Sequence, residues 1–214
     1  MRVKICGIMR PQDIEAASKH GADAVGFVVE THISRRNLRL EEAKRLIKNV
    51  PVFMSKIAVT STSDLKVLQE IVTRLHPDAL QVHGCDLRTA NNIRKRNPGL
   101  SIILATPIRD ADSISKAETT TGYSDAVMAD SPSEMGMGGT GRIHDWKLTA
   151  RLRNRIYPHP LILAGGLTPN NVKSAIKEVR PYGVDVSSGV ERTIGVKDHR
   201  KMKEFIKRAK EAEA

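Results

Sequence analysis

Residues 2–28 read RVKICGIMRPQDIEAASKHGADAVGFV, a strand, a helix and a second strand in close succession. Val3 and Ile5 alternate with polar residues, as in a strand with one buried face. A helix start follows at Pro11, and His20-Gly21 is typical of a helix that ends at glycine. The apolar run Asp23–Val28 predicts the next strand. Strand and helix therefore alternate from the first residues of the chain.

The same alternation continues along the whole sequence. The strands that we expect lie at Val3–Cys6, Asp23–Val28, Val52–Val59, Ala79–Val82, Ser101–Ala105, Ala126–Asp130, Leu161–Ala164 and Gly183–Val186. The helices that we expect lie at Gln12–His20, Glu41–Lys48, Asp64–Leu75, Leu87–Arg96, Asp110–Ala117, Trp146–Arg153, Asn170–Val179 and Asp198–Glu211. Ser63-Asp64 can cap the third helix, and Thr168-Pro169 places a proline in the first turn of the seventh.

This alternation defines the fold class. Eight strands that alternate with eight helices require a parallel sheet. Eight is also the number of strands that closes into a barrel with its helices outside. We therefore predict a single-domain (β/α)8 TIM barrel over residues 1–214. A doubly wound open sheet is the alternative, because hydrophobic periodicity does not report closure. No shift of composition or Pro/Ser-rich linker marks a domain boundary.

The charge of the chain narrows the choice of partner. Lys and Arg total 35 against 24 Asp and Glu, so the net charge is +11. Such a charge suits either nucleic acid or a small anionic substrate. The basic residues are spread over many segments, and aromatic residues make up only 3% of the chain, which leaves few side chains to stack on bases. We expect a small phosphorylated molecule as the partner and keep a nucleic-acid-binding barrel as the alternative.

Several other classes of protein lack support in the sequence. No apolar run is long enough to span a bilayer, and the chain opens on a strand pattern rather than a signal sequence, so we expect no membrane partner. Cys6 and Cys85 are expected as reduced thiols in the cytoplasm. The histidines are scattered, no Cys/His/Asp set has the spacing of metal ligands, and no dinucleotide fingerprint occurs, so we expect neither metal nor cofactor. Monomer and homodimer both stay open.

Glycine-rich turns follow the last two predicted strands. They are Gly165-Gly166 after the seventh strand and Ser187-Ser188-Gly189 after the eighth. Each leads toward a helix start, where backbone N–H groups can point at an anion, and in barrels these two loops form the usual phosphate site. The alternative is that they only make tight turns. We predict a phosphate site at this end of the barrel.

Titratable residues gather at the same end of the strands. Cys6 ends the first strand, and His83 follows the fourth. Asp130 ends the sixth after an apolar run, where loss of water would raise its pKa and suit it to donate a proton. Arg35 and Arg36 lie in the loop after the second strand, and a guanidinium matches a carboxylate or phosphate with two hydrogen bonds. The ordinary alternatives are a buried free thiol, a turn-capping aspartate, a solvated basic loop and a histidine that satisfies a carbonyl.

Six segments in order along the chain carry a resemblance to a known family. They are Lys4–Ile8, Gly21–Val28, Gln81–Gly84, Gly138–Gly141, Ala164–Leu167 and Val184–Glu191. With these segments in register over nearly the whole chain, the sequence resembles the phosphoribosylanthranilate isomerases of tryptophan biosynthesis. The resemblance implies a (β/α)8 barrel and an aldose–ketose isomerase (an intramolecular oxidoreductase) that needs no metal or cofactor.

The resemblance also implies a reaction and its residues. The reaction is the Amadori rearrangement of N-(5-phosphoribosyl)anthranilate to 1-(2-carboxyphenylamino)-1-deoxyribulose 5-phosphate. The resemblance makes Cys6 the general base and Asp130 the general acid. It places Arg36 against the anthranilate carboxylate, and Asp185 and His83 against the substrate. The residues implied in phosphate binding are Gly139, Thr140, Gly141, Gly165, Gly166, Ser187, Ser188 and Gly189.

The sequence departs from the family pattern in three places. The second loop reads Ser34-Arg35-Arg36-Asn37, whereas the family usually has a tyrosine after its arginine, so Arg35 is the alternative to Arg36. The sixth strand ends in Met128-Ala129-Asp130 rather than in two leucines before the aspartate. The fifth ends in Leu104-Ala105-Thr106, where a lysine–alanine pair is common. None of these departures removes a group that the chemistry needs.

A second isomerase of similar fold is the nearest alternative. The histidine-pathway barrel performs an Amadori rearrangement on a larger substrate with an aspartate base in its first strand. Cys6 occupies that place here, and no second phosphate loop occurs in the first half of the chain. Both observations favour the tryptophan-pathway family.

Overall fold

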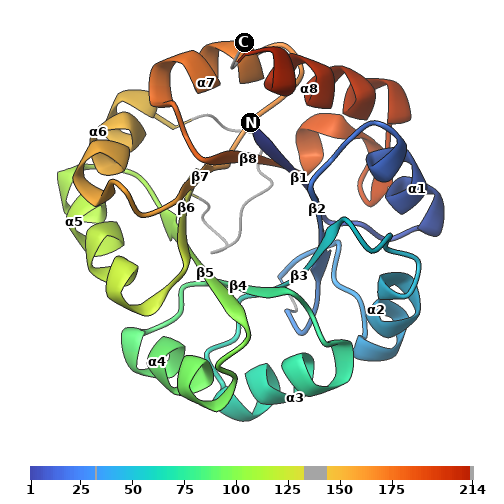
Figure 1. Ribbon diagram of the computed structural model, residues 1–214, viewed down its shortest axis with the longest axis horizontal. Coiled ribbons are helices and arrows are strands. Elements are labelled where there is room, and N and C mark those ends of the chain that lie inside the picture. Colours follow the sequence, from blue (N-terminus) through green and yellow to red (C-terminus); the bar gives the residue numbers. More distant parts are fainter. Residues whose placement is uncertain (32, 133–143, 213–214) are drawn as a thin grey trace.

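Eight parallel strands close into a barrel, and helices surround it as an outer ring (Figure 1). The computed structural model describes residues 1–31, 33–132 and 144–212. Strand order around the barrel follows chain order, and the first strand pairs with both the second and the eighth. The predicted (β/α)8 barrel is therefore confirmed, and the open-sheet alternative is wrong because no edge strand is left in the sheet.

The element bounds follow the repeat. The strands are β1 (Arg2–Cys6), β2 (Ala24–Val28), β3 (Ser55–Thr60), β4 (Ala79–His83), β5 (Ser101–Pro107), β6 (Ala126–Asp130), β7 (Leu161–Leu163) and β8 (Gly183–Val186). The helices are α1 (Pro11–Lys19), α2 (Leu40–Ile47), α3 (Leu65–Leu75), α4 (Leu87–Arg96), α5 (Ala111–Thr119), α6 (Trp146–Ile156), α7 (Val172–Val179) and α8 (His199–Glu211). A small hairpin, β9 (Glu191–Thr193) and β10 (Val196–Lys197), is added between β8 and α8.

Two predicted element starts differ from the structure by more than one residue. The strand expected from Val52 begins at Ser55, because Val52 and Phe53 lie in a turn with 90% and 99% of their surface exposed. The helix expected from Asn170 begins at Val172. Asn171 holds the preceding turn, since its Oδ1 accepts from the Thr168 amide at 2.8 Å and its Nδ2 donates to the Gly166 carbonyl at 2.9 Å. Pro169 therefore lies in that turn rather than in the first turn of α7.

The predicted helix signals at α1 and α3 are confirmed. The Asp64 carboxylate accepts hydrogen bonds from the amides of Lys66 and Val67, which otherwise have no partner in the first turn of α3. Gly21 follows the end of α1 with a φ of +87°, a conformation that favours glycine.

Both faces of the barrel strands are buried. In β1, Val3 and Ile5 belong to the large core between the barrel and its helices, whereas Cys6 belongs to a smaller cluster inside the barrel. The prediction of a single buried face is therefore wrong for β1. Lys4 and Cys6 are only 6% and 7% exposed, because closure of the barrel covers the face that carries them. Polar residues of this inner face build the site.

The helices that cover the barrel are short, and the longest described one, α8, has 13 residues. Over the described ranges, no helix is both long and apolar enough to cross a membrane. In the same ranges no group of three or more His, Cys, Asp or Glu side chains is placed to hold a metal ion.

Candidate active site

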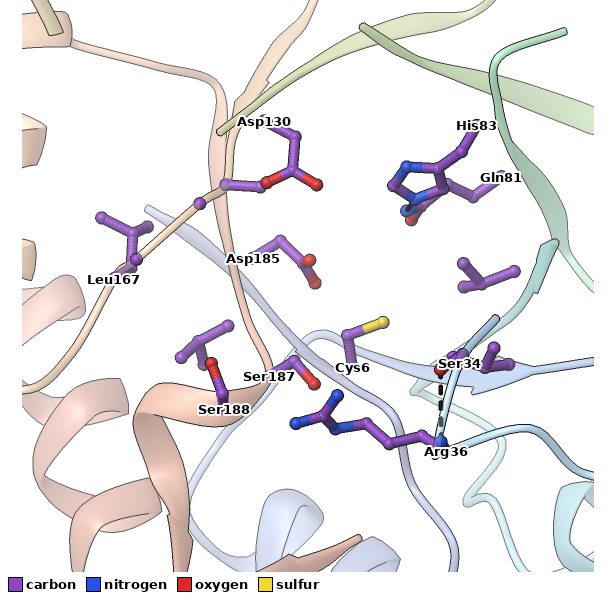
Figure 2. Close-up of a pocket in the computed structure, with 16 residues that line it drawn as sticks. Cys6, Ser34, Arg36, Gln81, His83, Asp130, Leu167, Asp185, Ser187 and Ser188 are labelled. Carbon is purple, nitrogen blue, oxygen red and sulfur yellow. Dashed lines mark hydrogen bonds between the residues drawn. The ribbon is translucent and has the colours of Figure 1, made fainter. Parts of the chain in front are cut away.

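A pocket opens at the carboxyl-terminal end of the barrel strands (Figure 2). The predicted site residues that line it are Cys6, Arg36, His83, Asp130, Gly165, Gly166, Asp185, Ser187 and Ser188. Gly139, Thr140 and Gly141 lie outside the described residues. Gly189 does not line the pocket: it packs so tightly on the Leu167 carbonyl that a Cβ would collide with it. Gly189 thus brings two loops together.

Cys6 lies at the end of β1 and pairs with Gly26 of β2. A Cβ on Gly26 would lie 3.0 Å from the Cys6 Sγ and 3.0 Å from the Lys4 Nζ. The missing side chain thus leaves room for a thiol and an ammonium beside each other. Burial raises the pKa of the Cys6 thiol, while the positive charges of Lys4 and Lys197 oppose that rise.

Lys4 and Asp185 form an ion pair inside the barrel. The two residues are register partners in β1 and β8, and the Lys4 Nζ donates to the Asp185 Oδ1 at 2.8 Å. Burial alone would lower the pKa of Lys4, but the Asp185 carboxylate and the Cys6 sulfur raise it above its ordinary value. Lys4 therefore stays protonated.

Asp130 ends β6 with 7% of its surface exposed. Burial raises the pKa of its carboxyl to about 6, as expected for a carboxyl after an apolar run. The Ser131 amide donates to its Oδ1 at 2.7 Å, which opposes the rise and fixes the orientation of the carboxyl. The result is a carboxyl that holds a proton at higher pH than an exposed aspartate.

A buried hydrogen-bond chain supports the segment after Asp130. The Ser131 Oγ lies 3.1 Å from the His144 Nδ1, and the His144 Nε2 lies 2.6 Å from the Thr149 Oγ1 on α6. Gly165, with a φ of +81°, packs against Ser131 where a Cβ would collide with it. The sequence carried no signal for this hydrogen-bond network, because no local sequence pattern connects its residues.

Arg36, and not Arg35, lines the pocket, since Arg35 is exposed. The Arg36 Nε and Nη2 donate to the two carboxylate oxygens of Glu191 at 2.8 Å and 2.7 Å. The Lys197 Nζ also donates to Glu191, at 2.9 Å. Two cations thus share one carboxylate, and one positive charge is left over beside the pocket. Gly7 makes the approach possible, because a Cβ there would lie 2.5 Å from the Arg36 Cδ.

Glu191 and Lys197 were not predicted as site residues. Both come from the hairpin β9–β10. Glu191 ends the last family-like segment and was the one available signal, whereas nothing marked Lys197. Burial tends to raise the pKa of Glu191, but its contacts with Arg36 and Lys197 outweigh burial and lower it. Glu191 is therefore ionised.

His83 and Gln81 form a polar pair on β4. The His83 Nε2 lies 2.9 Å from the Gln81 Nε2. Burial lowers the pKa of His83 to about 4, so the ring is neutral and accepts from the amide. The Gln81 Oε1 is buried and has no hydrogen-bond partner in the part of the chain that the structure describes. A buried acceptor beside the pocket is therefore available to a ligand hydroxyl or N–H.

The turn after β7 has the form of an anion site. Gly165 and Gly166 have φ values of +81° and +63°, which favour glycine. Neither of their amide N–H groups donates to an acceptor within the described residues. Ser187 and Ser188, after β8, line the same side of the pocket. Unpaired N–H groups in such turns suit an anion such as phosphate.

The fold and the site define the class of protein. Cys6, Asp130, Asp185 and His83 all face one central space at the carboxyl ends of the strands (Figure 2). In (β/α)8-barrel enzymes the active site lies at this end, with phosphate bound by the loops after the last two strands. The arrangement is that of a barrel enzyme with an anion-binding pocket.

Comparison with known proteins identifies the family. The model of the N-(5'-phosphoribosyl)anthranilate (PRA) isomerase family matches residues 3–208. The N-(5'-phosphoribosyl)anthranilate isomerase of Methanothrix thermoacetophila is 46% identical over 211 residues, which cover 98% of each chain. The chain belongs to the PRA isomerase family, whose members are isomerases of tryptophan biosynthesis. This confirms the resemblance seen in the sequence.

Two solved structures agree with this assignment. A phosphoribosylanthranilate isomerase in complex with reduced 1-(o-carboxyphenylamino)-1-deoxyribulose 5-phosphate superimposes with a TM-score of 0.85 at 33% identity, covering 99% of each chain. Monomers generated from the dimeric phosphoribosylanthranilate isomerase of Thermotoga maritima superimpose with a TM-score of 0.86 at 32% identity, again over 99% of each chain.

Proposed function

We propose that this chain converts N-(5-phosphoribosyl)anthranilate into 1-(2-carboxyphenylamino)-1-deoxyribulose 5-phosphate by an Amadori rearrangement. One observation carries the proposal: a thiol (Cys6) and a carboxyl with a raised pKa (Asp130) face one pocket. Cationic Arg36 and the glycine turn at Gly165-Gly166 line that pocket too. An acid, a base and two anion-binding positions are what a phosphorylated, carboxylated substrate of this reaction needs.

Asp130 acts first, as the general acid. Its carboxyl gives a proton to the ring oxygen of the ribose while the bond between C1 and that oxygen breaks. The nitrogen lone pair forms a double bond to C1, which leaves an iminium cation. The pKa of about 6 supports this role, because a carboxyl buried away from water still holds its proton in a useful fraction of molecules near neutrality.

Cys6 acts second, as the general base. Its thiolate takes the proton from C2, and the electrons of that C–H bond form the C1–C2 double bond and neutralise the iminium. The resulting enolamine becomes the ketone when its hydroxyl loses a proton and C1 gains one. The positive charges of Lys4, Lys197 and the substrate iminium favour the thiolate against the effect of burial.

The remaining pocket residues bind and orient the substrate. Arg36, with the positive charge left over beside Glu191, holds the anthranilate carboxylate. Asp185 and His83 contact the sugar, and the unpaired Gln81 Oε1 accepts a hydrogen bond from it.

The substrate phosphate binds to the loops after β7 and β8, on the side of the pocket that these loops form. Gly165, Gly166, Ser187 and Ser188 line that side. Gly139, Thr140 and Gly141, which the structure does not describe, complete the phosphate site in this proposal. Metal and cofactor have no part in this mechanism.

We also propose that the chain forms a homodimer through the amino-terminal end of the barrel. Phe53, 99% exposed, and Val52, 90% exposed, are the most exposed large apolar side chains of the described chain. Phe53 stands at the rim of a cavity of about 390 Å³, here named the amino-terminal cavity, which Ile57, Ile103 and Val184 help to line. A two-fold contact would bury both copies of this patch. The dimeric state of the Thermotoga maritima relative supports this assembly.

The test of the function is a coupled assay with the purified protein and a chelator in place of added metal. We expect loss of the fluorescence of phosphoribosylanthranilate at a rate proportional to protein concentration. No turnover, together with salt-dependent retention on DNA or RNA, would instead support the nucleic-acid-binding alternative. We place the reaction in the cytoplasm, because Cys6 and Cys85 are both free thiols.

A further inference from the structure

Lys4 is a buried cation directly beneath the active-site pocket. It lies two residues before Cys6 on the inner face of β1, and only 6% of its surface is exposed. Lys4 does not line the substrate pocket; it lines the amino-terminal cavity at the opposite end of the barrel. Its ammonium therefore lies beneath the pocket and is not part of the pocket lining.

The Lys4 ammonium stands between an anion and the thiol. On one side it donates to the Asp185 Oδ1 at 2.8 Å. On the other side it shares with the Cys6 sulfur the space that Gly26 leaves open, since each of the two atoms lies 3.0 Å from the position of a Cβ on Gly26. Asp185 thus anchors the ammonium, and the ammonium faces the sulfur.

We infer that Lys4 is a positioning residue that stabilises the thiolate form of Cys6 against the effect of burial and so prepares the base for proton abstraction. The inference rests on the proposed function for its catalytic consequence. A thiolate is the form that can accept the C2 proton, and a fixed ammonium beside the sulfur stabilises that form electrostatically. Because Lys4 lies below the pocket, it supplies this charge before the substrate arrives.

Among the described residues, four charged side chains interact electrostatically with Cys6, and they come from different elements. Lys4 belongs to β1, Asp185 to β8 and Lys197 to β10, and Arg36 lies in the loop after β2. The carboxylate of Asp185 opposes the thiolate, whereas the three cations favour it. Removal of Lys4 alone therefore acts twice, because it deletes the nearest cation and leaves the Asp185 charge uncompensated.

A purely structural role for Lys4 makes a different prediction. Replacement of a buried ion pair by groups without charge often leaves a protein as stable as before. The variant Lys4→Met/Asp185→Asn should therefore fold even where Lys4→Met alone does not. If the pair served only the fold, the titration of Cys6 would not depend on Lys4.

The experiment measures the titration of Cys6 by the ultraviolet absorbance of its thiolate. All variants carry Cys85→Ser, and Cys6→Ser/Cys85→Ser is the blank. We expect Lys4→Met to raise the titration midpoint by about 1 pH unit or more, and Lys4→Arg to leave it near the wild-type value. Asp185→Asn should lower the midpoint, and Lys4→Met/Asp185→Asn should raise it relative to Asp185→Asn.

A second variant tests the geometry without removing a charge. Gly26→Ala inserts a methyl group at the point that the ammonium and the sulfur both approach to 3.0 Å, so it should also raise the midpoint. The inference would be overturned if both folded variants kept the titration midpoint of Cys6 unchanged. Lys4→Met/Asp185→Asn is compared with Asp185→Asn, and Gly26→Ala is compared with the protein that carries only Cys85→Ser.

The catalytic consequence is read separately from the titration. In the isomerase assay Lys4→Met should lower kcat about tenfold or more with little change in KM, and Lys4→Arg should recover most of the loss. A wild-type protein without isomerase activity but with the expected midpoint shifts would overturn the proposed function and leave the Lys4–Cys6 coupling standing. Normal kcat in a folded Lys4→Met protein would overturn the positioning role.

Discussion

Glu191 holds Arg36 by two hydrogen bonds, 2.8 Å from the Arg36 Nε and 2.7 Å from the Arg36 Nη2. The pair joins the loop after β2 to the hairpin β9–β10, two segments at opposite ends of the chain. Lys197 binds the same carboxylate, so the guanidinium is fixed while a net positive charge stays beside the pocket. In the proposed function, the binding of the substrate carboxylate by Arg36 therefore depends on Glu191, which does not itself line the pocket.

Glu191→Gln should weaken substrate binding more than turnover. The substitution removes the charge that orients Arg36, and hydrogen bonds to charged groups contribute about 1.5–3 kcal/mol, on the order of ten- to a hundredfold in KM. The measurement is KM and kcat in the isomerase assay. Glu204→Gln is the matched control, because Glu204 pairs with Arg208 on the exposed face of α8. An unchanged KM in Glu191→Gln would contradict the role of Glu191.

Arg36→Ala should raise KM strongly, whereas Arg35→Ala should have little effect. The physical reason is that Arg36 lines the pocket, while the neighbouring Arg35 is exposed to solvent. Steady-state kinetics of both variants decide the matter. A larger rise of KM in Arg35→Ala than in Arg36→Ala would transfer the carboxylate clamp to Arg35.

Cys6→Ser and Asp130→Asn should each lower kcat by about 10²- to 10⁴-fold, the usual contribution of a positioned acid or base. A serine hydroxyl is a far weaker acid than a thiol and supplies almost no anion, and an asparagine has no proton to give to the ring oxygen. Circular dichroism should show both variants folded. Cys85→Ser is the control for loss of a thiol and should keep full activity. Near-wild-type rates in both site variants would reject the mechanism.

The pH dependence of kcat/KM should be bell-shaped, with its acid limb near pH 6, where Asp130 titrates. The productive form carries a proton on Asp130 and none on Cys6. Below the acid limb both groups are protonated, and the thiolate is lost. Between the two limbs Asp130 and Cys6 together hold one proton, so the fraction of enzyme with that proton on Asp130 does not change with pH. Above the pKa of Cys6, which burial raises, both protons are gone.

The acid limb is assigned by substitution. In Asp130→Asn the residual rate should rise with pH straight through pH 6, because only the titration of Cys6 remains. A limb near pH 6 that persists in Asp130→Asn would belong to another group.

The fold could be predicted from the sequence because each strand–helix unit carries its own local signals. Alternation at Val3 and Ile5, the cap at Asp64 and the stop at Gly21 all act within a few residues of sequence. The strand count then implied closure. The prediction of a strand from Val52 was wrong, because the periodicity of a sequence does not distinguish apolar residues buried in a core from apolar residues exposed at the surface.

The site was predictable only where one residue carries the signal. Cys6 and Asp130 end strands, and the glycines at 165 and 166 mark a turn, so each could be placed at the same end of the barrel. Lys4 and Glu191 are paired with Asp185 and Arg36, which lie far from them in the sequence. No spacing rule connects such residues, because barrel closure and a late hairpin bring them together.

Phe53→Asp should convert the proposed homodimer into a monomer. Phe53 projects at the rim of the amino-terminal cavity with 99% of its surface exposed, and a charged side chain there would have to be buried in a two-fold contact. Light scattering after size-exclusion chromatography measures the mass. Tyr157→Asp is the matched control, because Tyr157 is 77% exposed but does not line that cavity. A wild-type protein of monomer mass, or a Phe53→Asp protein that stays dimeric, would show that this face is not the interface.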